Sequence, residues 1–383
     1  MSVEVAGDGV DNFLILTQPT TTETIVDKVK GTASYLMMPF WEAETAFQYC
    51  LLSFLPDEYG QEATKAYEYA KRFFIAPLSL AGMGITFLLE VSGRLLTGVA
   101  RIFESRNYRY LSGNAEERSP EKPKFMHLNF CGLYGGLPYS CGGTTPGNAR
   151  IGELAERVRA EDLDLLFLCE CNRMLTPALY YNLRDDFSHF FVDIGLNTWG
   201  IESCQFVASR VPIISAPSFH PYSEVVEGEE WHMMRGFFAV ETADKWYLYT
   251  HLHSGNDADD REMRQRELGA IQDFIVERTA DKPCVLLGDL NINRLDESND
   301  DYQKMLGLGF KDGFPDQHPA AFTGSDMLDH HIKKNAAEAP PEVLDYILVN
   351  DKGTGLELQL SVLETYKPQL DQSLSDHKGL IGV

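Results

Sequence analysis

Two hydrophobic patterns divide the chain near residue 120. Between about Ser34 and Arg109, apolar residues recur at the spacing of helices, with prolines at 39, 56 and 77. Beyond residue 120, short apolar runs typical of strands alternate with amphipathic stretches typical of helices. The pattern predicts a helical N-terminal region followed by a larger α/β domain.

The second part contains enough apolar runs for a mixed sheet or for two sheets. Helices are expected at 149–160 and 261–278. Strands are expected at 125–130, 165–169, 205–209, 236–241, 246–251, 285–288, 342–349, 356–363 and 378–383.

Composition refines the domain boundaries. Residues 1–33 are polar and rich in Thr, which predicts a flexible lead-in before a helical region at 34–110. Residues 111–124 combine charge, Ser and two prolines, as exposed linkers do. The α/β domain is then expected over 125–383.

One stretch of the helical region, Phe73–Leu89, contains no charged residue. It is slightly shorter than the ~20 apolar residues that a membrane-spanning helix needs, and Glu90 and Arg94 follow directly. A buried core helix and a membrane-associated segment explain it equally well, and a full span explains it less well. The helical region therefore carries a membrane-association hypothesis.

Charge and cysteine content narrow the function classes. The 383-residue chain has a formal net charge of -24, which repels polyanions and disfavours nucleic acid as a partner. Seven scattered cysteines without a C-x-x-C pair indicate reduced thiols. The acidic N-terminus lacks a signal-peptide pattern. We expect a cytoplasmic or peripheral membrane protein, with a secreted bacterial effector as the alternative.

Polar side chains occupy the ends of several predicted strands, where a core would not hold them unpaired. Taken singly, each is as readily a strand tip or a salt-bridged carboxylate as a functional group. Together their types match metal-assisted hydrolysis of a phosphate ester. They are Asn129, Glu170, His251, Asp289, Asn291, Asp345, Asp376 and His377.

The stretch PCVLLGDLNINR at 283–294 shows the pattern most clearly. On an extended backbone Asp289 and Asn291 would project to the same side. Carboxylates such as Glu170 and Asp376 suit Mg²⁺, with Mn²⁺ as a substitute, and no Cys/His spacing favours zinc. A His paired with an Asp can accept a proton from water.

Several motifs together resemble the endonuclease/exonuclease/phosphatase superfamily, and most closely its Mg²⁺-dependent neutral sphingomyelinases. The motifs are PCVLLGDLNIN, THLHSG followed by DADDREMRQREL, EVLDYILV and SDHKGL. The resemblance covers about residues 122–383. It implies a four-layered α/β sandwich with two central mixed sheets.

The resemblance also implies roles for the polar residues. The metal side would consist of Glu170, Asn129 and Asp376. His377 would be the general base with Asp345 as its partner, His251 would bind phosphate, and Asp289 and Asn291 would orient water and phosphate. His253 and Arg150 are weaker candidates, for which structural roles are equally expected.

The predicted reaction is Mg²⁺-dependent hydrolysis of a phospholipid at a membrane surface, sphingomyelin giving ceramide and phosphocholine. Arg235-Gly236 stands where the family often has Lys-Gly, which leaves head-group specificity less defined than the chemistry. The alternatives are a nuclease, a phosphoinositide phosphatase, whose motifs this chain departs from, and an inactive scaffold.

Overall fold

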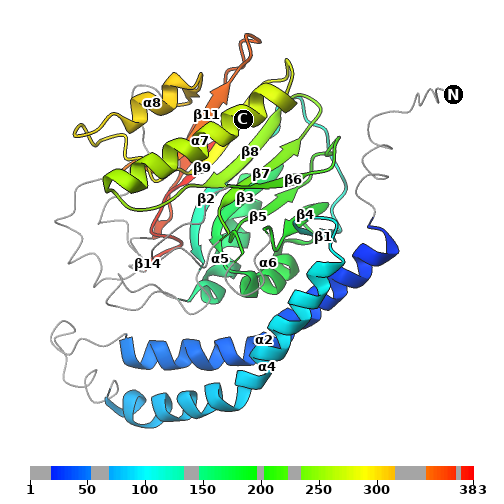
Figure 1. Cartoon of the computed structure of the whole chain (residues 1–383), viewed down its shortest axis with the longest axis vertical. Coiled ribbons are helices and arrows are strands. Elements are labelled where there is room, and N and C mark those ends of the chain that lie inside the picture. The colour runs from blue at the N-terminus through cyan, green and yellow to red at the C-terminus, as the bar shows by residue number, and fades with distance from the viewer. Residues whose placement is uncertain are drawn as a thin grey trace.

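The structure is a computed structural model that describes residues 19–52, 69–132, 146–195, 202–222, 234–314, 342–367 and 372–383. Residues 1–18 of the predicted lead-in lie outside this part of the chain. Within it, two sheets lie face to face, and helices cover their outer faces (Figure 1).

The first sheet has seven strands, and the second has six. The first runs in the order β1 (Arg109–Ser112), β4 (His189–Val192), β5 (Phe206–Ser209), β3 (Leu165–Cys171), β2 (Phe125–Gly132), β15 (Gly379–Gly382) and β12 (Leu360–Leu363). The second runs β10 (Lys311–Asp312), β11 (Asp345–Asn350), β9 (Cys284–Asp289), β8 (Trp246–His251), β7 (Gly236–Glu241) and β6 (Ser218–Pro221). A short ribbon pairs β13 (Tyr366–Lys367) with β14 (Gln372–Ser373).

Both large sheets are mixed, because β2 pairs in parallel with β3 and β8 pairs in parallel with β9. Helices α5 (Gly147–Glu161) and α6 (Thr176–Leu183) pack on the outside of the first sheet, next to the 3₁₀ turn η3 (Arg173–Leu175). Helices α7 (Ala258–Arg278) and α8 (Asp301–Gly307) cover the second sheet. The predicted four-layered sandwich is confirmed.

Strand alternation explains how polar side chains reach the space between the sheets. Along β2, Met126, Leu128 and Phe130 pack toward the outer helices, whereas Phe125 packs toward the second sheet. Because successive side chains of a strand point to opposite faces, His127 and Asn129 share the face of Phe125. The same alternation places the ends of β8, β9 and β11 in this inner layer.

The N-terminal region forms a helical hairpin below the sheets in Figure 1. It consists of α2 (Thr21–Leu52), then the π-helical turn η1 (Lys71–Ile75), which leads into α4 (Ala76–Ile102). The flexible lead-in was predicted to extend to residue 33, but α2 already begins at Thr21. The reason is a capping box at its start, where Thr20 and Glu23 exchange side-chain and backbone hydrogen bonds.

The predicted linker is partly structured. Leu111 and Ser112 end β1, which pairs antiparallel with β4 at the edge of the first sheet. Further along, the Arg118 guanidinium forms ion pairs with Asp162 and Asp164. Residues 109–118 are therefore attached to the α/β domain, and the short edge strand β1 was not evident from the pattern.

Candidate active site

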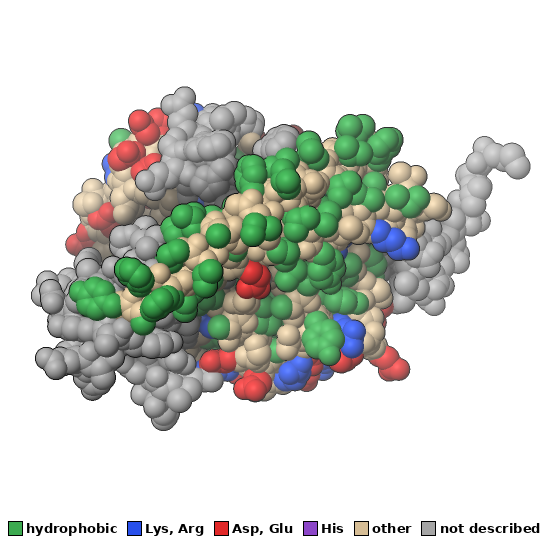
Figure 2. Space-filling view, turned by 90° about the horizontal axis from the view of Figure 1, so that it is seen from below, with side chains coloured by type: hydrophobic (Ala, Val, Ile, Leu, Met, Phe, Trp, Pro, Cys, Tyr) green, Lys and Arg blue, Asp and Glu red, His purple; other side chains and the backbone are tan. Residues whose placement is uncertain are grey.

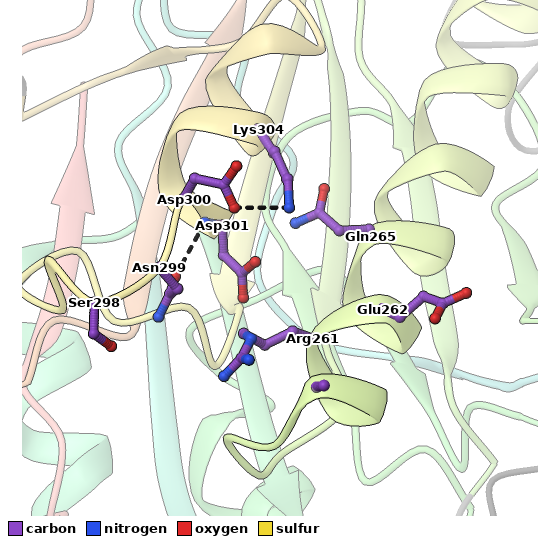
Figure 3. Close-up of a pocket in the computed structure, with 9 residues that line it drawn as sticks. Arg261, Glu262, Gln265, Ser298, Asn299, Asp300, Asp301 and Lys304 are labelled. Carbon is purple, nitrogen blue, oxygen red and sulfur yellow. Dashed lines mark hydrogen bonds and ion pairs between the residues drawn. The ribbon is translucent and has the colours of Figure 1, made fainter.

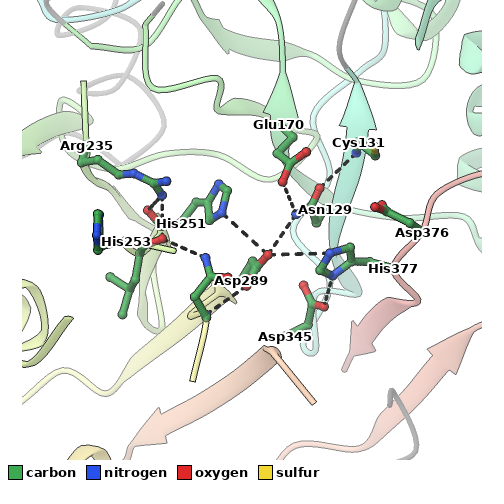
Figure 4. Close-up of polar contacts among 12 residues, drawn as sticks. Asn129, Cys131, Glu170, Arg235, His251, His253, Asp289, Asp345, Asp376 and His377 are labelled. Atoms are coloured by element: carbon green, nitrogen blue, oxygen red, sulfur yellow. Dashed lines mark hydrogen bonds and ion pairs between the residues drawn. The ribbon is translucent and has the colours of Figure 1, made fainter. Parts of the chain in front are cut away.

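One carboxylate oxygen, Asp289 Oδ2, lies at the centre of the predicted site (Figure 4). It accepts a hydrogen bond of 2.9 Å from Asn129 Nδ2, which also donates to Glu170 Oε1 at 2.8 Å. The Nε2 atoms of His251 and His377 lie 3.7 and 3.9 Å from the same oxygen. Side chains from both sheets thus converge on one point.

Glu170 reaches this point through an unusual backbone. Its φ of 52° is left-handed, and the register between β2 and β3 shifts between Asn129 and Gly132. Such irregularities at strand ends re-aim side chains. Burial and the nearby charge of Asp376 raise the pKa of Glu170 to about 7. The two carboxylates repel each other, and a bound metal ion would relieve this repulsion.

His251 is buried beside a fixed cation. Arg235 Nη1 donates to the backbone carbonyls of His251 and Leu252 at 2.9 and 2.6 Å. Burial and the Arg235 charge hold the pKa of His251 well below its usual range. His251 is therefore neutral at pH 7 and can donate from one ring nitrogen. From the sequence, Arg235 was expected only to bear on head-group specificity. In the structure its hydrogen bonds hold the backbone at His251 and Leu252.

His377 and Asp345 form the predicted pair. His377 Nδ1 lies 2.6 Å from Asp345 Oδ2. Asp345 raises the pKa of His377 well above its usual value against the opposing effect of burial, while His377 and His127 hold the pKa of Asp345 well below its own. In addition, Ser375 Oγ accepts from the His377 backbone N–H at 3.1 Å. The imidazole is thereby fixed with Nε2 directed toward Asp289.

A second histidine on Asp345 was not predicted. His127 Nε2 lies 2.7 Å from Asp345 Oδ1, and the His127 side chain is fully buried. Its Nδ1 is buried without a hydrogen-bond partner among the described residues. The signal was present in MHLNF, because His127 lies two residues before Asn129 and thus on the same strand face.

The geometry of Asn291 differs from the prediction. Strand β9 ends at Asp289, and Asn291 has a left-handed φ of 50°. Asn291 therefore does not follow the extended path that would align it with Asp289. Its backbone N–H donates to Asp289 Oδ1 at 3.0 Å, and its Nδ2 donates to Leu252 O at 2.9 Å. These bonds tie Asp289 to the loop after β8.

The two weaker candidates make structural contacts. His253 Nε2 lies 2.9 Å from Asp260 Oδ1 in the first turn of α7. The buried Arg150 guanidinium donates to the carbonyls of Phe130, Cys131 and Leu374, joining the end of β2 to the loop before His377.

The donor set fits a hard divalent cation. Ligand atoms of Glu170, His251 and Asp289 lie within 4.8 Å of one another, and so do those of Asp289, Asp345 and His377. Asp376 does not belong to either group, but it is the charge that most raises the pKa of Glu170. The carboxylate oxygens of Glu170, Asp289 and Asp345 are the type of ligand that Mg²⁺ and Mn²⁺ prefer.

A separate open hollow of about 650 Å³ lies between α7 and α8 (Figure 3). Its walls carry both signs of charge, and Lys304 Nζ already pairs with Asp300 Oδ1 at 2.7 Å. None of the predicted site residues lines it. The converging polar groups between the sheets, rather than this hollow, form the candidate active site.

A family model for the endonuclease/exonuclease/phosphatase family matches residues 133–377. The chain belongs to this family. No curated protein sequence matches the chain. Membership agrees with the motif order in the sequence and with the two-sheet fold. The chain is thus related to phosphoesterases, and the finer activity is a separate question.

Several solved structures share the fold. SmcL superposes with a TM-score of 0.56 at 23% identity, covering 69% of this chain and 99% of SmcL. A magnesium-bound variant of beta toxin from Staphylococcus aureus gives 0.57 at 18% identity, covering 68% and 99%. Sphingomyelinase C from Streptomyces griseocarneus gives 0.55 at 19%, covering 69% and 99%. At these identities the likeness shows the fold alone.

Proposed function

We propose that this protein is a Mg²⁺-dependent phospholipid phosphodiesterase that cleaves sphingomyelin to ceramide and phosphocholine. The observation that carries the proposal is the convergence of His251 Nε2 and His377 Nε2 on Asp289 Oδ2, at 3.7 and 3.9 Å. Two imidazoles that face one carboxylate can orient a phosphate and a water molecule relative to each other.

In the proposed mechanism His377 Nε2 accepts a proton from a water molecule whose oxygen attacks phosphorus. The new P–O bond forms as the bond to the ceramide oxygen breaks, and the ceramide oxygen takes up a proton from solvent water. Asp345 accepts a hydrogen bond from His377 Nδ1–H and stabilises the imidazolium that results. Neutral His251 donates a hydrogen bond to a phosphoryl oxygen.

The oxygen ligands around Glu170 would hold the metal ion. When bound, Mg²⁺ supplies positive charge for the phosphoryl and leaving oxygens. Asn129 positions the carboxylates of Glu170 and Asp289 by donating to both. His377 accepts a proton only when neutral, so the proposal requires compensation of the carboxylate charge that raises its pKa.

Three observations support a lipid substrate. The fold is shared with sphingomyelinase C, the net charge of -24 disfavours polyanions, and an apolar helical hairpin adjoins the catalytic domain. Because sphingomyelin resides in bilayers, we propose a phospholipid partner at a membrane surface and a peripheral membrane location.

The test is a side-by-side assay with Mg²⁺ on sphingomyelin vesicles, phosphatidylcholine vesicles, a phosphoinositide and plasmid DNA. We expect phosphocholine release from sphingomyelin that chelation abolishes. Glu170→Ala and His377→Ala should each lower the rate about 10²–10⁴-fold. Lys304→Ala, in the separate hollow, is the matched control and should retain the wild-type rate.

Each alternative has its own outcome in this assay. Cleavage of DNA but not of vesicles would assign a nuclease, and release of inorganic phosphate from the phosphoinositide would assign a phosphatase. Intact substrates throughout, with folded protein and Mg²⁺ present, would leave an inactive scaffold of the same fold.

A further inference from the structure

Helix α4 buries its small and polar residues. On one side it packs against α2, and a Cβ added at Gly93 would lie only 2.4 Å from Met37 Cγ and 2.7 Å from Ala33 O. Close backbone contact of this kind requires a glycine. The buried positions of α4 are Ala76, Ser79, Glu90, Gly93, Thr97 and Ala100.

The large apolar residues of α4 and of the turn before it point outward. Ile85 is 78% exposed and Leu78 is 72% exposed. Seven of these residues follow one helical stripe, called the outer face here, and Figure 2 shows apolar side chains along this side of the hairpin. The outer face consists of Phe74, Leu78, Ile85, Leu88, Leu95, Val99 and Ile102.

This distribution is the reverse of that in a helix of a water-soluble protein, which buries its large apolar stripe. Small residues at the helix contact and large apolar residues outside are typical of helices surrounded by lipid. The segment 73–102 is long and apolar enough to cross a membrane, yet only 17% of its most apolar part is buried among the described residues. Of the three interpretations, the buried core helix is therefore not what the structure shows.

We propose that the outer face docks into the headgroup and acyl boundary of a zwitterionic bilayer, with the hairpin lying in the membrane plane. Burial of apolar side chains away from water supplies the driving force. Docking is inferred from the exposed apolar face of α4 alone. Only its role in bringing the site to its lipid rests on the proposed function.

The position of α2 favours an in-plane arrangement over a span. Ala43 of α2 lies 3.4 Å from a Cβ built at Gly82, so Glu42 and Glu44 flank the middle of the apolar stretch. A hairpin inserted across the bilayer would carry both carboxylates into hydrocarbon. Lying flat, it immerses the N-terminal part of α4, beside which Figure 1 shows α2 on the side of the sheets.

Charge on the hairpin indicates a neutral lipid surface. Arg94 pairs with Glu90 at 2.6 Å, and Arg101 is directed to the Gly195 carbonyl of the catalytic domain at 3.0 Å. The described outer face thus presents no basic cluster, and the chain carries a net charge of -24. Anionic lipids attract basic segments and repel an acidic protein. A choline-lipid surface avoids that repulsion.

The hairpin is attached beside the active site. Arg173, in the turn after β3, donates to Ser34 of α2 at 3.0 Å and to Glu202 at 3.2 Å. Lys30 of α2 also pairs with Glu104 at 2.8 Å in a buried environment. Because Arg173 follows Glu170 by three residues, membrane contact at α4 holds the end of β3 that bears Glu170 near the lipid surface.

The test is co-sedimentation of the full chain with vesicles of phosphatidylcholine and sphingomyelin. We expect the wild type to bind, and Leu78→Glu with Ile85→Glu to lower the bound fraction at least tenfold. Val276→Glu, an exposed apolar position on α7, is the matched control and should bind like the wild type. Adding phosphatidylserine should weaken binding of the wild type, and high salt should leave binding to neutral vesicles unchanged.

Other occupants of the outer face give different results. If the wild type fails to bind vesicles, or the double variant binds equally well, the docking proposal is wrong. A dimer in solution that the double variant converts to a monomer would assign the face to a second copy. Binding without hydrolysis of any lipid would contradict the proposed function and leave the docking intact.

Depth separates the two membrane arrangements. A fluorescent amino acid placed at Ile85 should shift to the blue on adding vesicles, whereas the same probe at Glu42 on α2 should not. Equal shifts at the two positions would indicate a spanning hairpin and overturn the in-plane proposal.

Discussion

At the residue scale, the most informative contact is the pair of histidines on Asp345. Its two oxygens each accept one hydrogen bond, from His377 Nδ1 at 2.6 Å and from His127 Nε2 at 2.7 Å. A carboxylate held at both oxygens cannot rotate, so the orientation of the His377 ring depends on His127 as well. His127 is thus a positioning residue that acts through Asp345, comparable to the outer partners of metal ligands.

We expect His127→Met, which removes the donor at similar size, to lower kcat about 10- to 100-fold without changing KM. His127→Gln keeps an N–H donor and should recover most of the rate. The measurement is steady-state hydrolysis with Mg²⁺, with thermal unfolding recorded for each variant.

The coupling to Asp345 separates positioning from general packing. In the Asp345→Ala background, His127→Met should have little further effect on kcat, because its route of action is already lost. If the two substitutions instead multiply, His127 supports the core only and the positioning role is wrong.

At the element scale, the sequence predicted the central strands well and the edges poorly. The ranges expected for β7 and β8 match the structure, since continuous apolar runs mark strands buried on both faces. Strands β1, β4 and β6 were missed, because four-residue strands at or near a sheet edge carry too little periodicity.

The same division applies to the site. Residue types and strand ends were readable, and the structure brings Asn129, Glu170, His251, Asp289 and the Asp345–His377 pair together. What could not be predicted depends on backbone that leaves the regular strand. The left-handed φ at Glu170 and at Asn291 changes where each side chain points, and a period of two cannot represent this.

The close approach of the parallel strands β8 and β9 requires a glycine at position 288. Its φ is 154°, and a Cβ there would lie 1.8 Å from the Thr250 carbonyl oxygen. Gly288→Ala must therefore push the two strands apart next to His251 and Asp289. We expect the free energy of unfolding to fall by about 1–3 kcal/mol, together with a loss of activity, measured by urea denaturation and by the Mg²⁺ assay.

A helical glycine provides the control. At Gly269, inside α7, an added Cβ meets nothing within 4 Å. Gly269→Ala should raise the free energy of unfolding by about 0.5–1 kcal/mol, because alanine has the higher helix propensity. Equal effects of the two substitutions would show that close contact at Gly288 does not limit stability.

At the scale of the whole molecule, the clustered carboxylates make the stability of the metal-free protein depend on pH. Burial and Asp376 raise the pKa of Glu170 from its ordinary 4.5 to about 7, so the folded protein retains a proton that the unfolded chain releases. The free energy of unfolding therefore falls as pH rises through this interval.

The His377–Asp345 pair makes stability depend on pH in two separate ranges. The raised pKa of His377 contributes stability that is complete below its ordinary 6.5 and is lost as pH rises through the folded value. The lowered pKa of Asp345 contributes stability that is complete above its ordinary 3.8 and is lost as pH falls through the folded value. Metal-free protein should accordingly be most stable at mildly acidic pH.

Magnesium should reverse the loss of stability at higher pH, because a cation stabilises the ionised form of Glu170 in the folded state. We expect Mg²⁺ to raise Tm clearly at pH 8 and little at pH 5.5, where protons compete for the same oxygens. At 100 times Kd the gain corresponds to about 2.7 kcal/mol. In Glu170→Gln, which keeps the shape and removes the charge, both the Mg²⁺ gain and the pH dependence should shrink. An equal rise in Tm at the two pH values, or a rise that Glu170→Gln retains in full, would show that the ion binds elsewhere on this acidic protein.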